Sequence, residues 1–272
     1  MAPIARQVLN ASLALAFAGQ MAAAEGAWDA TVGFARDTWY DTGSVITAPL
    51  SWDRYEWGAF ALGATVIGVS VATLDQSTRN DAQDDRSASS DRMAKLSNTL
   101  GTGFSLGVLG VSAGIGAITG AQRPLQLARD GLEASIITTL IVTPMKFAVG
   151  RARPDQDPDG SDDFQPLSGN LSFPSGHTTQ AFAIASVVAN TYRDHWWPGA
   201  LAFGVAGTVG LARINDNQHY LSDVIAGALI GGSIGWMVVN LNRERRIAPG
   251  VEGQVTAGWD GDGRYLGLAL RF

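Results

Sequence analysis

Six apolar stretches dominate the pattern of hydrophobic and polar positions. They cover residues 57–74, 101–120, 133–150, 177–192, 197–212 and 222–241. Each is close to the roughly 20 residues that a helix needs to cross a bilayer. The pattern therefore predicts six helices. It favours membrane helices, with buried helices of a tightly packed soluble core as the alternative.

Glycines recur at helical spacing on the last two stretches. One set is spaced by three residues and the other by four: Gly204, Gly207 and Gly210, then Gly227, Gly231 and Gly235. Small residues on one helix face let two helices approach closely, as they do in membrane bundles. We therefore expect both sets to lie at helix contacts.

The N-terminal part of the chain has two sections. Residues 1–24 combine a basic start at Arg6, an apolar run over 8–19 and small residues at 22–24, which predicts a secretory signal. The alternative is an uncleaved anchor helix. Residues 25–55 have no clear period and predict a short docking segment, while residues 75–95 are charged and predict a polar loop.

The C-terminal tail, residues 246–272, changes to a strand pattern. Apolar residues alternate with polar ones on both sides of a turn signal at 260–263, which predicts a β-hairpin. One hairpin cannot close a membrane barrel. We therefore expect it to pack on the helices or on a partner. The predicted fold is all-α, a six-helix bundle over residues 56–245 with a short C-terminal hairpin.

Composition narrows the class of protein. The formal net charge of −6 argues against a nucleic-acid partner. The absence of cysteine excludes disulfides and thiolate metal sites. The mean hydropathy of +0.08 is low for a chain embedded mostly in lipid. This value keeps open a helical periplasmic domain that is attached to a membrane.

The scarce residue types gather in three segments. The chain has two lysines and three histidines, and one lysine and two histidines fall in segments 146–154, 173–177 and 213–223. If consecutive helices alternate in direction, these segments lie at four helix ends on one side of the bundle. Each segment alone has a simpler explanation, such as a charged anchor at a helix end or a helix cap.

The residue types suit a phosphate group. Lys146, Arg153 and Arg213 supply positive charge and directed donors. The turn Ser175–His177 opens a helix, whose free amides also attract anions, and Gly176 leaves room for a close approach.

Two histidines complete the set. Asp223 lies one helical turn after His219 and could hold that imidazole in one tautomer, which makes His219 the better nucleophile. His177 is the better general acid for the leaving oxygen. Spacing alone does not decide between these two roles.

Together the segments resemble the three-part signature of the type 2 phosphatidic acid phosphatase superfamily. Lys146, Arg153 and Pro154 match its first part and residues 174–177 its second. Arg213, His219 and Asp223 match its third part, in which Ala212 replaces the usual serine.

The resemblance implies specific roles for these residues. It makes His219 the nucleophile and His177 the acid. It also implies a phosphate cradle without a metal or other cofactor, formed by Lys146, Arg153, Ser175, Gly176 and Arg213.

The expected function is hydrolysis of a phosphomonoester or pyrophosphate of a lipid, such as phosphatidic acid, a prenyl pyrophosphate or lipid A. The alternatives are a periplasmic acid phosphatase on soluble phosphomonoesters, a vanadium-dependent haloperoxidase and a non-catalytic membrane protein. Basic residues beside the apolar stretches, at 123, 129, 243, 245 and 246, favour a bacterial inner-membrane protein whose site faces the periplasm. A cleaved signal followed by six spans would instead place the site inside.

Overall fold

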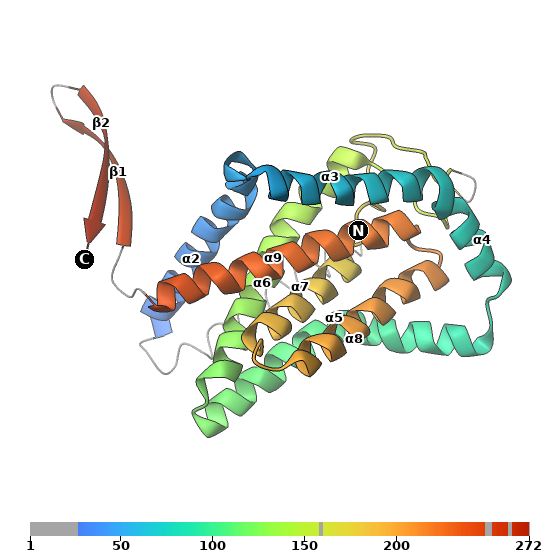
Figure 1. Ribbon diagram of the computed structural model, residues 1–272, viewed down its shortest axis with the longest axis horizontal. Coiled ribbons are helices and arrows are strands. Elements are labelled where there is room, and N and C mark those ends of the chain that lie inside the picture. The colour runs from blue at the N-terminus through green and yellow to red at the C-terminus, as the bar shows by residue number, and fades with distance from the viewer. Residues whose placement is uncertain (1–26, 158–159, 248–251, 261–262, 272) are drawn as a thin grey trace.

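The computed structural model describes residues 27–157, 160–247, 252–260 and 263–271 (Figure 1). The predicted signal, residues 1–24, lies outside this part. In chain order the helices are α2 (Ala27–Thr47), α3 (Arg54–Val69), α4 (Asp75–Asp84), α5 (Ala88–Thr119), α6 (Gln122–Val149), α7 (Gly176–Thr191), α8 (Trp196–Asn215) and α9 (Leu221–Ile247).

The described part therefore contains eight α-helices, two more than the hydrophobic pattern predicts. The expectation of a loop over residues 75–95 is wrong, because this segment contains α4 and the start of α5. Ser87 accepts a hydrogen bond from the backbone of Ser90 as the N-cap of α5, which fixes the point where α5 begins.

The other additional helix, α2, occupies most of the segment 25–55, which showed no period. Ion pairs to distant helices hold it in place. Asp37 contacts Arg129 of α6 at 2.7 Å, and Asp41 contacts Arg245 of α9. Hydrophobic periodicity cannot reveal a helix that is positioned by polar contacts between residues far apart in sequence.

A short π-helical turn, Ser70–Leu74, connects α3 to α4. α3 itself begins with a capping box between Asp53 and Glu56. Single π turns inside helices are frequent at functional sites. Here the turn directly precedes Asp75, whose side chain is fully buried.

Helix α7 lies at the centre of the bundle, with α6, α8 and α9 around it (Figure 1). A β-carbon at Gly231 would lie 2.1 Å from the carbonyl oxygen of Thr179, and one at Gly235 2.3 Å from that of Ala183. The glycine face of α9 therefore contacts the backbone of α7, as its spacing predicts.

The second glycine set behaves differently. A β-carbon at Gly210 would lie 2.7 Å from Val224 Cγ1, but one at Gly204 or Gly207 would meet nothing within 4 Å. The prediction of a close helix contact is therefore wrong for Gly204 and Gly207. These two glycines lie on the part of α8 that the rest of the described chain leaves uncovered.

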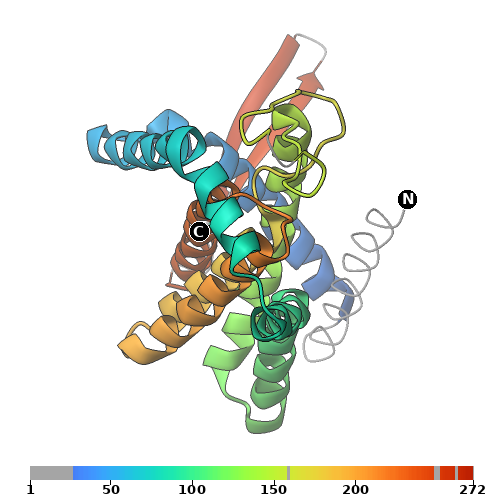
Figure 2. The same cartoon turned by 90° about the vertical axis from the view of Figure 1, so that its right-hand side faces the viewer.

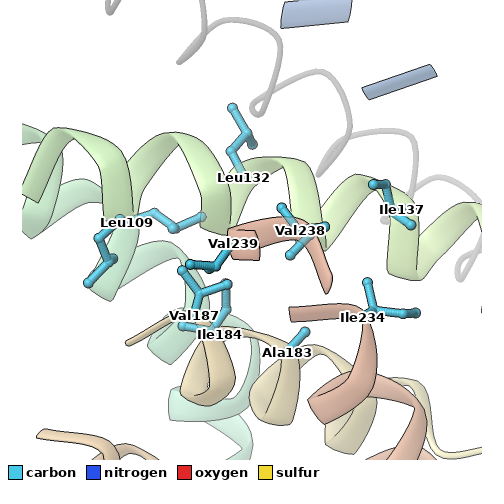
Figure 3. Close-up of a cluster of buried hydrophobic side chains, with 11 residues drawn as sticks. Leu109, Leu132, Ile137, Ala183, Ile184, Val187, Ile234, Val238 and Val239 are labelled. Carbon is cyan, nitrogen blue, oxygen red and sulfur yellow. The ribbon is translucent and has the colours of Figure 1, made fainter. Parts of the chain in front are cut away.

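The main apolar core lies between α5, α6, α7 and α9 (Figure 3). Its large members include Leu109, Ile137, Ile184, Val187 and Val238, all nearly or fully buried. Burying a side chain of this size stabilises the fold by about 1.5–3 kcal/mol. The core holds α6, α7 and α9 in the alignment that brings their ends together at the site described below.

Among the residues that the structure describes, three helical segments are long and apolar enough to cross a membrane, where the pattern suggested six. They are Arg54–Asp84, Gln122–Val149 and Leu221–Arg246. Only 6% of the apolar window of the first is buried inside the protein. Phe60, Leu62 and Val66 are accordingly exposed along α3. A large exposed apolar surface of this kind is typical of a membrane contact.

Two antiparallel strands, β1 (Glu252–Asp260) and β2 (Gly263–Arg271), follow the helices and lie apart from them (Figure 1). In their register, Val255 pairs with Leu268 and Trp259 with Arg264. The turn between them, residues 261–262, lies outside the described residues, so the complete hairpin and its packing stay a prediction.

Candidate active site

Backbone contacts join the three sequence segments at one end of the bundle. The Ser175 amide at the start of α7 donates to the Asp223 carbonyl in α9 at 2.9 Å. The His219 amide donates to the Arg213 carbonyl at the end of α8 at 3.3 Å. Lys146, near the end of α6, donates through Nζ to the Pro174 carbonyl at 2.6 Å. The four helix ends therefore meet, as alternating helix directions predict.

His219, two residues before the start of α9, faces Asp223 in the first turn of that helix. His219 Nδ1 lies 3.4 Å from Asp223 Oδ2. The same oxygen accepts hydrogen bonds from Ser172 Oγ at 2.6 Å and from the Tyr220 amide at 3.0 Å. These donors hold the carboxylate in one orientation, and an Nδ1–H tautomer directs the other ring nitrogen, Nε2, away from Asp223.

The surroundings of His219 favour its neutral form. Burial is the largest cause that lowers the pKa of His219 from 6.5 to about 3. The positive charges of Lys146 and Arg153 act in the same direction, and the hydrogen bond with Asp223 opposes them. The His219 imidazole is therefore unprotonated, and available as a nucleophile, throughout the physiological pH range.

A buried arginine, Arg151, lies behind this pair. Its NH1 donates to Asp223 Oδ1 and to Ser222 Oγ, both at 2.7 Å. Its guanidinium also stacks on the Tyr220 ring, with 4.3 Å between the guanidinium carbon and the ring centroid. Asp223 thus receives the charge of Arg151 on one oxygen while its other oxygen faces His219.

Asp75 completes the network from the far side. Its Oδ2 accepts from Arg151 NH2 at 2.7 Å and from Ser222 Oγ at 2.5 Å, and its Oδ1 accepts from the Ser222 amide at 2.8 Å. The side chains of Asp75, Arg151 and Asp223 have no exposed surface. The buried charges of two carboxylates therefore flank one guanidinium.

The sequence motif did not assign roles to Arg151, Ser172, Ser222 or Asp75. Signals for two of them are present in the sequence. Arg151 lies inside the first segment. Asp75 is a lone acid at the end of an apolar stretch, where a charge indicates function by default.

Lys146 lies beneath the turn that opens α7. Its Nζ also donates to the Leu171 carbonyl at 2.7 Å, and its Cε would lie 3.6 Å from a β-carbon on Gly176. The lysine charge is therefore held directly below Ser175 and Gly176. Ser175 is fully buried and accepts at Oγ from Thr178 at 2.9 Å, while His177 is partly exposed as the second residue of α7.

The two arginines of the predicted cradle contact the loop between α8 and α9. Arg153 donates to Gln218 Oε1 at 2.5 Å, and Arg213 donates to Asp216 Oδ2 at 2.7 Å. α4 covers the same loop, with Arg79 Nε 3.1 Å from Asn217 Oδ1. Figure 2, which faces this end of the bundle, shows α4 beside the loop.

The arrangement can bind an anion and attack it. Lys146, Arg153 and Arg213 lie at this end of the bundle near the neutral imidazole of His219, and Arg151 lies behind it. The free backbone amides at the start of α7 add further hydrogen-bond donors for an anion. Among the described residues, His, Asp and Glu side chains form no group that could hold a metal ion. The Asp75 and Asp223 carboxylates are fully buried behind His219, whereas Asp216 in the α8–α9 loop pairs with Arg213.

Comparisons with known proteins agree with this geometry. A lipid A 1-phosphatase of Porphyromonas gingivalis is 35% identical over 120 residues, which cover 42% of this chain and 24% of that protein. A lipid A 1-phosphatase of Rhizobium etli is 39% identical over 105 residues, covering 36% of this chain and 42% of that protein. The chain therefore aligns with less than half the length of these relatives.

Solved structures show the same fold. The transmembrane phosphatidylglycerolphosphate phosphatase of Bacillus subtilis superposes with a TM-score of 0.54 and 20% identity, over 70% of this chain and 96% of that one. LpxE of Aquifex aeolicus superposes with a TM-score of 0.50 and 24% identity, over 62% and 96% of the two chains.

The family match covers the segment that contributes most of the site. Residues 127–247 match the sequence model of the PAP2 superfamily. This range runs from α6 to α9 and includes Lys146, His177 and His219. The segment 127–247 of this chain therefore belongs to the PAP2 superfamily, the group that its three sequence motifs resemble.

Proposed function

We propose that this protein is a metal-independent phosphatase that removes a phosphate group from a membrane lipid through a phosphohistidine on His219. The observation that carries the proposal is the neutral, buried imidazole of His219. Asp223 orients it, and cations surround it at a point where four helix ends meet.

In the first step, His219 Nε2 attacks the phosphorus atom while the bond between phosphorus and the lipid oxygen breaks. The imidazole becomes positively charged in the phosphohistidine. Asp223 stabilises that charge through Nδ1, and Arg151 and Ser172 keep the carboxylate in place. In the second step, water attacks the phosphohistidine, releases inorganic phosphate and restores the neutral histidine.

His177 moves the protons in both steps. In the first it donates a proton to the lipid oxygen as this oxygen leaves, and in the second it takes a proton from the attacking water. Its place in the first turn of α7 puts it beside the turn that would hold the phosphate.

The cradle stabilises the transferring phosphoryl group. Lys146 lies under the α7 start, and Arg153 and Arg213 approach from the loops. Oxygen atoms of the substrate would accept the hydrogen bonds that Arg153 now donates to Gln218 and that Arg213 now donates to Asp216. Fixed donors and a helix N-terminus stabilise the charge on the phosphoryl oxygens in the transition state.

A lipid substrate suits the exposed apolar surface of α3, which a membrane would cover. The names of several relatives also support it, namely two lipid A 1-phosphatases and lipid phosphate phosphatase 1 of Arabidopsis thaliana. We further propose that the site faces the outer, periplasmic side of a bacterial inner membrane. The opposite end of the bundle carries arginines 123, 129, 243, 245 and 246, the bias expected of a cytoplasmic face.

The test is phosphate release by the full chain in detergent with a metal chelator, from a lipid phosphate and from a soluble aryl phosphate. His219→Asn should abolish release. His195→Asn, which changes an exposed histidine, should retain it. A preference for the aryl phosphate would support the soluble acid phosphatase instead.

The remaining alternatives have their own readouts. Release that survives in His219→Asn would contradict the phosphohistidine. No release from either substrate by the folded wild-type protein would contradict the phosphatase. Vanadate-dependent bromination of a dye would then favour a haloperoxidase, and its absence a non-catalytic protein.

A further inference from the structure

A second basic site lies at the end of the bundle opposite His219. A cavity of about 250 Å³ opens there between the start of α6 and the ends of α7 and α9. The polar and charged residues that line it include Asp130, Asn190, Thr191, Arg193, Arg243 and Arg246. The 16 residues of α7 separate it from the active site by about 24 Å, at a rise of 1.5 Å per residue.

The charges around the cavity do not balance. Arg246 forms a two-pronged pair with Asp130, with both N–O distances at 3.0 Å. Arg243 donates only to uncharged oxygens, Asn240 Oδ1 at 3.0 Å and the Asn190 carbonyl at 3.3 Å. Within the described part of the chain, Arg193 has no hydrogen bond or ion pair. The lining therefore carries three arginines and one carboxylate.

Four other acids at this end have partners of their own, and one of these is Asp194, which pairs with Arg123. Asp37 pairs with Arg129, and Asp41 with Arg245. Glu133 accepts from Asn242 at 2.6 Å. Arg193 and Arg243 are therefore not paired with a carboxylate among the described residues. Arg243 also lies within electrostatic range of the positive charges of Arg193 and Arg246. Cations gathered around a cavity favour an anion between them.

A buried hydroxyl points to the same conclusion. Thr191 Oγ1 is buried and has no hydrogen-bond partner among the described residues. A buried polar atom of this kind normally has a partner, and here it belongs to a residue of the cavity wall. The cavity is several times larger than the roughly 30 Å³ share of one water molecule, so it has room for a tetrahedral anion.

The cavity lies where lipid headgroups would be. α6 and α9 are candidate spans, and each runs from the active-site end to the cavity end. The 28 residues of α6 extend about 42 Å, more than the roughly 30 Å hydrocarbon thickness of a bilayer. Trp196 and Trp197, which follow Arg193 at the start of α8, are 83% and 57% exposed. Exposed tryptophans of this kind are typical of the membrane interface.

We propose that this cavity binds the phosphate group of an anionic phospholipid in the leaflet opposite the active site. Basic pockets between membrane helices on the cytoplasmic side bind such headgroups. The site is separate from the catalytic one. Binding there would hold the ends of α6, α7 and α9 together without taking part in hydrolysis.

The experiment compares thermal unfolding of the full chain in phosphatidylcholine nanodiscs with and without phosphatidylglycerol, and titrates short-chain phosphatidylglycerol in detergent. Arg193→Ala should weaken binding roughly fivefold and remove most of the added stability. Its matched control is Arg123→Ala, which removes an exposed charge paired with Asp194 at the same end and outside the lining. Arg243→Gln should weaken binding as Arg193→Ala does.

The outcomes separate the possible sources of the phosphate. An equal loss of phosphatidylglycerol binding in Arg193→Ala and Arg123→Ala would show that the lipid responds to general surface charge. No loss in either variant would show that the cavity does not bind the lipid. Both results would overturn the proposal. A third result would overturn the lipid assignment. In it, inorganic phosphate at constant ionic strength stabilises the wild type but not Arg193→Ala, and phosphatidylglycerol has no effect. The phosphatase rate of Arg193→Ala should equal that of the wild type. The lipid-binding test of the cavity and the phosphate-release test of the active site can therefore fail independently.

Discussion

The Arg151 guanidinium joins two buried carboxylates, those of Asp75 and Asp223. Only Asp223 faces His219, the proposed nucleophile. Asp75 acts through Arg151, because its charge and its hydrogen bonds to Ser222 fix the guanidinium that orients Asp223. Asp75 is therefore a positioning residue for His219, although it lies in another part of the sequence.

We expect Asp75→Asn to lower kcat on the order of tenfold to a hundredfold and to change KM little, because the substrate does not contact Asp75. Steady-state kinetics measure the two separately. Asp75→Glu should recover part of the rate. Asp85→Asn, at an exposed position just after α4, should behave as the wild type. A rise in KM with unchanged kcat would show that Asp75 serves binding instead.

His219 also makes stability depend on pH. The pKa of His219 is about 3 in the folded protein, compared with its ordinary value of 6.5. Between pH 3 and pH 6.5, His219 therefore binds a proton in the unfolded chain but not in the folded protein. The free energy of unfolding should therefore decrease as the pH falls below 6.5, by up to about 1.4 kcal/mol per pH unit.

Thermal unfolding in detergent over this pH range measures the effect. His219→Asn should show a weaker decrease than the wild type, because asparagine does not titrate. His195→Asn, which changes an exposed histidine, is the control variant. An identical pH dependence in the wild type and His219→Asn would contradict a buried, neutral His219.

The residues that we propose to contact a phosphate could be named from the sequence, but those that support them could not. His219, Asp223 and Lys146 belong to motifs with fixed spacing. Asp75 is separated from Arg151 by 76 positions, and only the tertiary fold brings them together. The partners of Arg153 and Arg213 likewise follow from the conformation of the loop between α8 and α9, which no periodicity describes.

At the scale of helices, the contact between α7 and α9 sets the position of His219, the proposed nucleophile. Gly231 allows the two backbones to touch, since a β-carbon there would lie 2.1 Å from the Thr179 carbonyl oxygen. The neighbouring Gly232 meets nothing within 4 Å. The pair therefore offers a test of helix packing in which both positions have the same helix propensity.

We expect Gly231→Ala to destabilise the protein by about 1–3 kcal/mol, because the added methyl group separates α7 from α9. Gly232→Ala should be neutral or slightly stabilising, by about 0.5–1 kcal/mol at most. Thermal unfolding of both variants in the same detergent provides the comparison. Equal effects of the two substitutions would show that the close contact contributes little.

Apolar periodicity predicts the helices that have an apolar face and misses the others. The six predicted stretches are all helical, because burial or lipid contact requires an apolar surface on each. α2 and α4 are held by polar contacts, through Asp41 with Arg245 and through Arg79 with Asn217. α4 has no side-chain N-cap, so neither a cap nor a hydrophobic period marks its start in the sequence.

At the scale of the whole molecule, the two ends of the bundle differ in chemistry. One end gathers His219 and the cations of the cradle, and the other gathers Arg193, Arg243 and Arg246 around a cavity. α6 and α9 join the two ends and are apolar between them. Such a molecule would present a catalytic site to one membrane face and a basic cavity to the other.

The most direct test of the central claim is to trap the phosphoenzyme. The full chain is mixed with a radiolabelled lipid phosphate, denatured rapidly in base and analysed by peptide mapping. We predict a base-stable, acid-labile phosphate on the peptide that contains His219. It should be absent in His219→Asn and present in His195→Asn, in which an exposed histidine is changed. Phosphate release without any label on His219, under conditions in which wild-type turnover is rapid, would contradict the account.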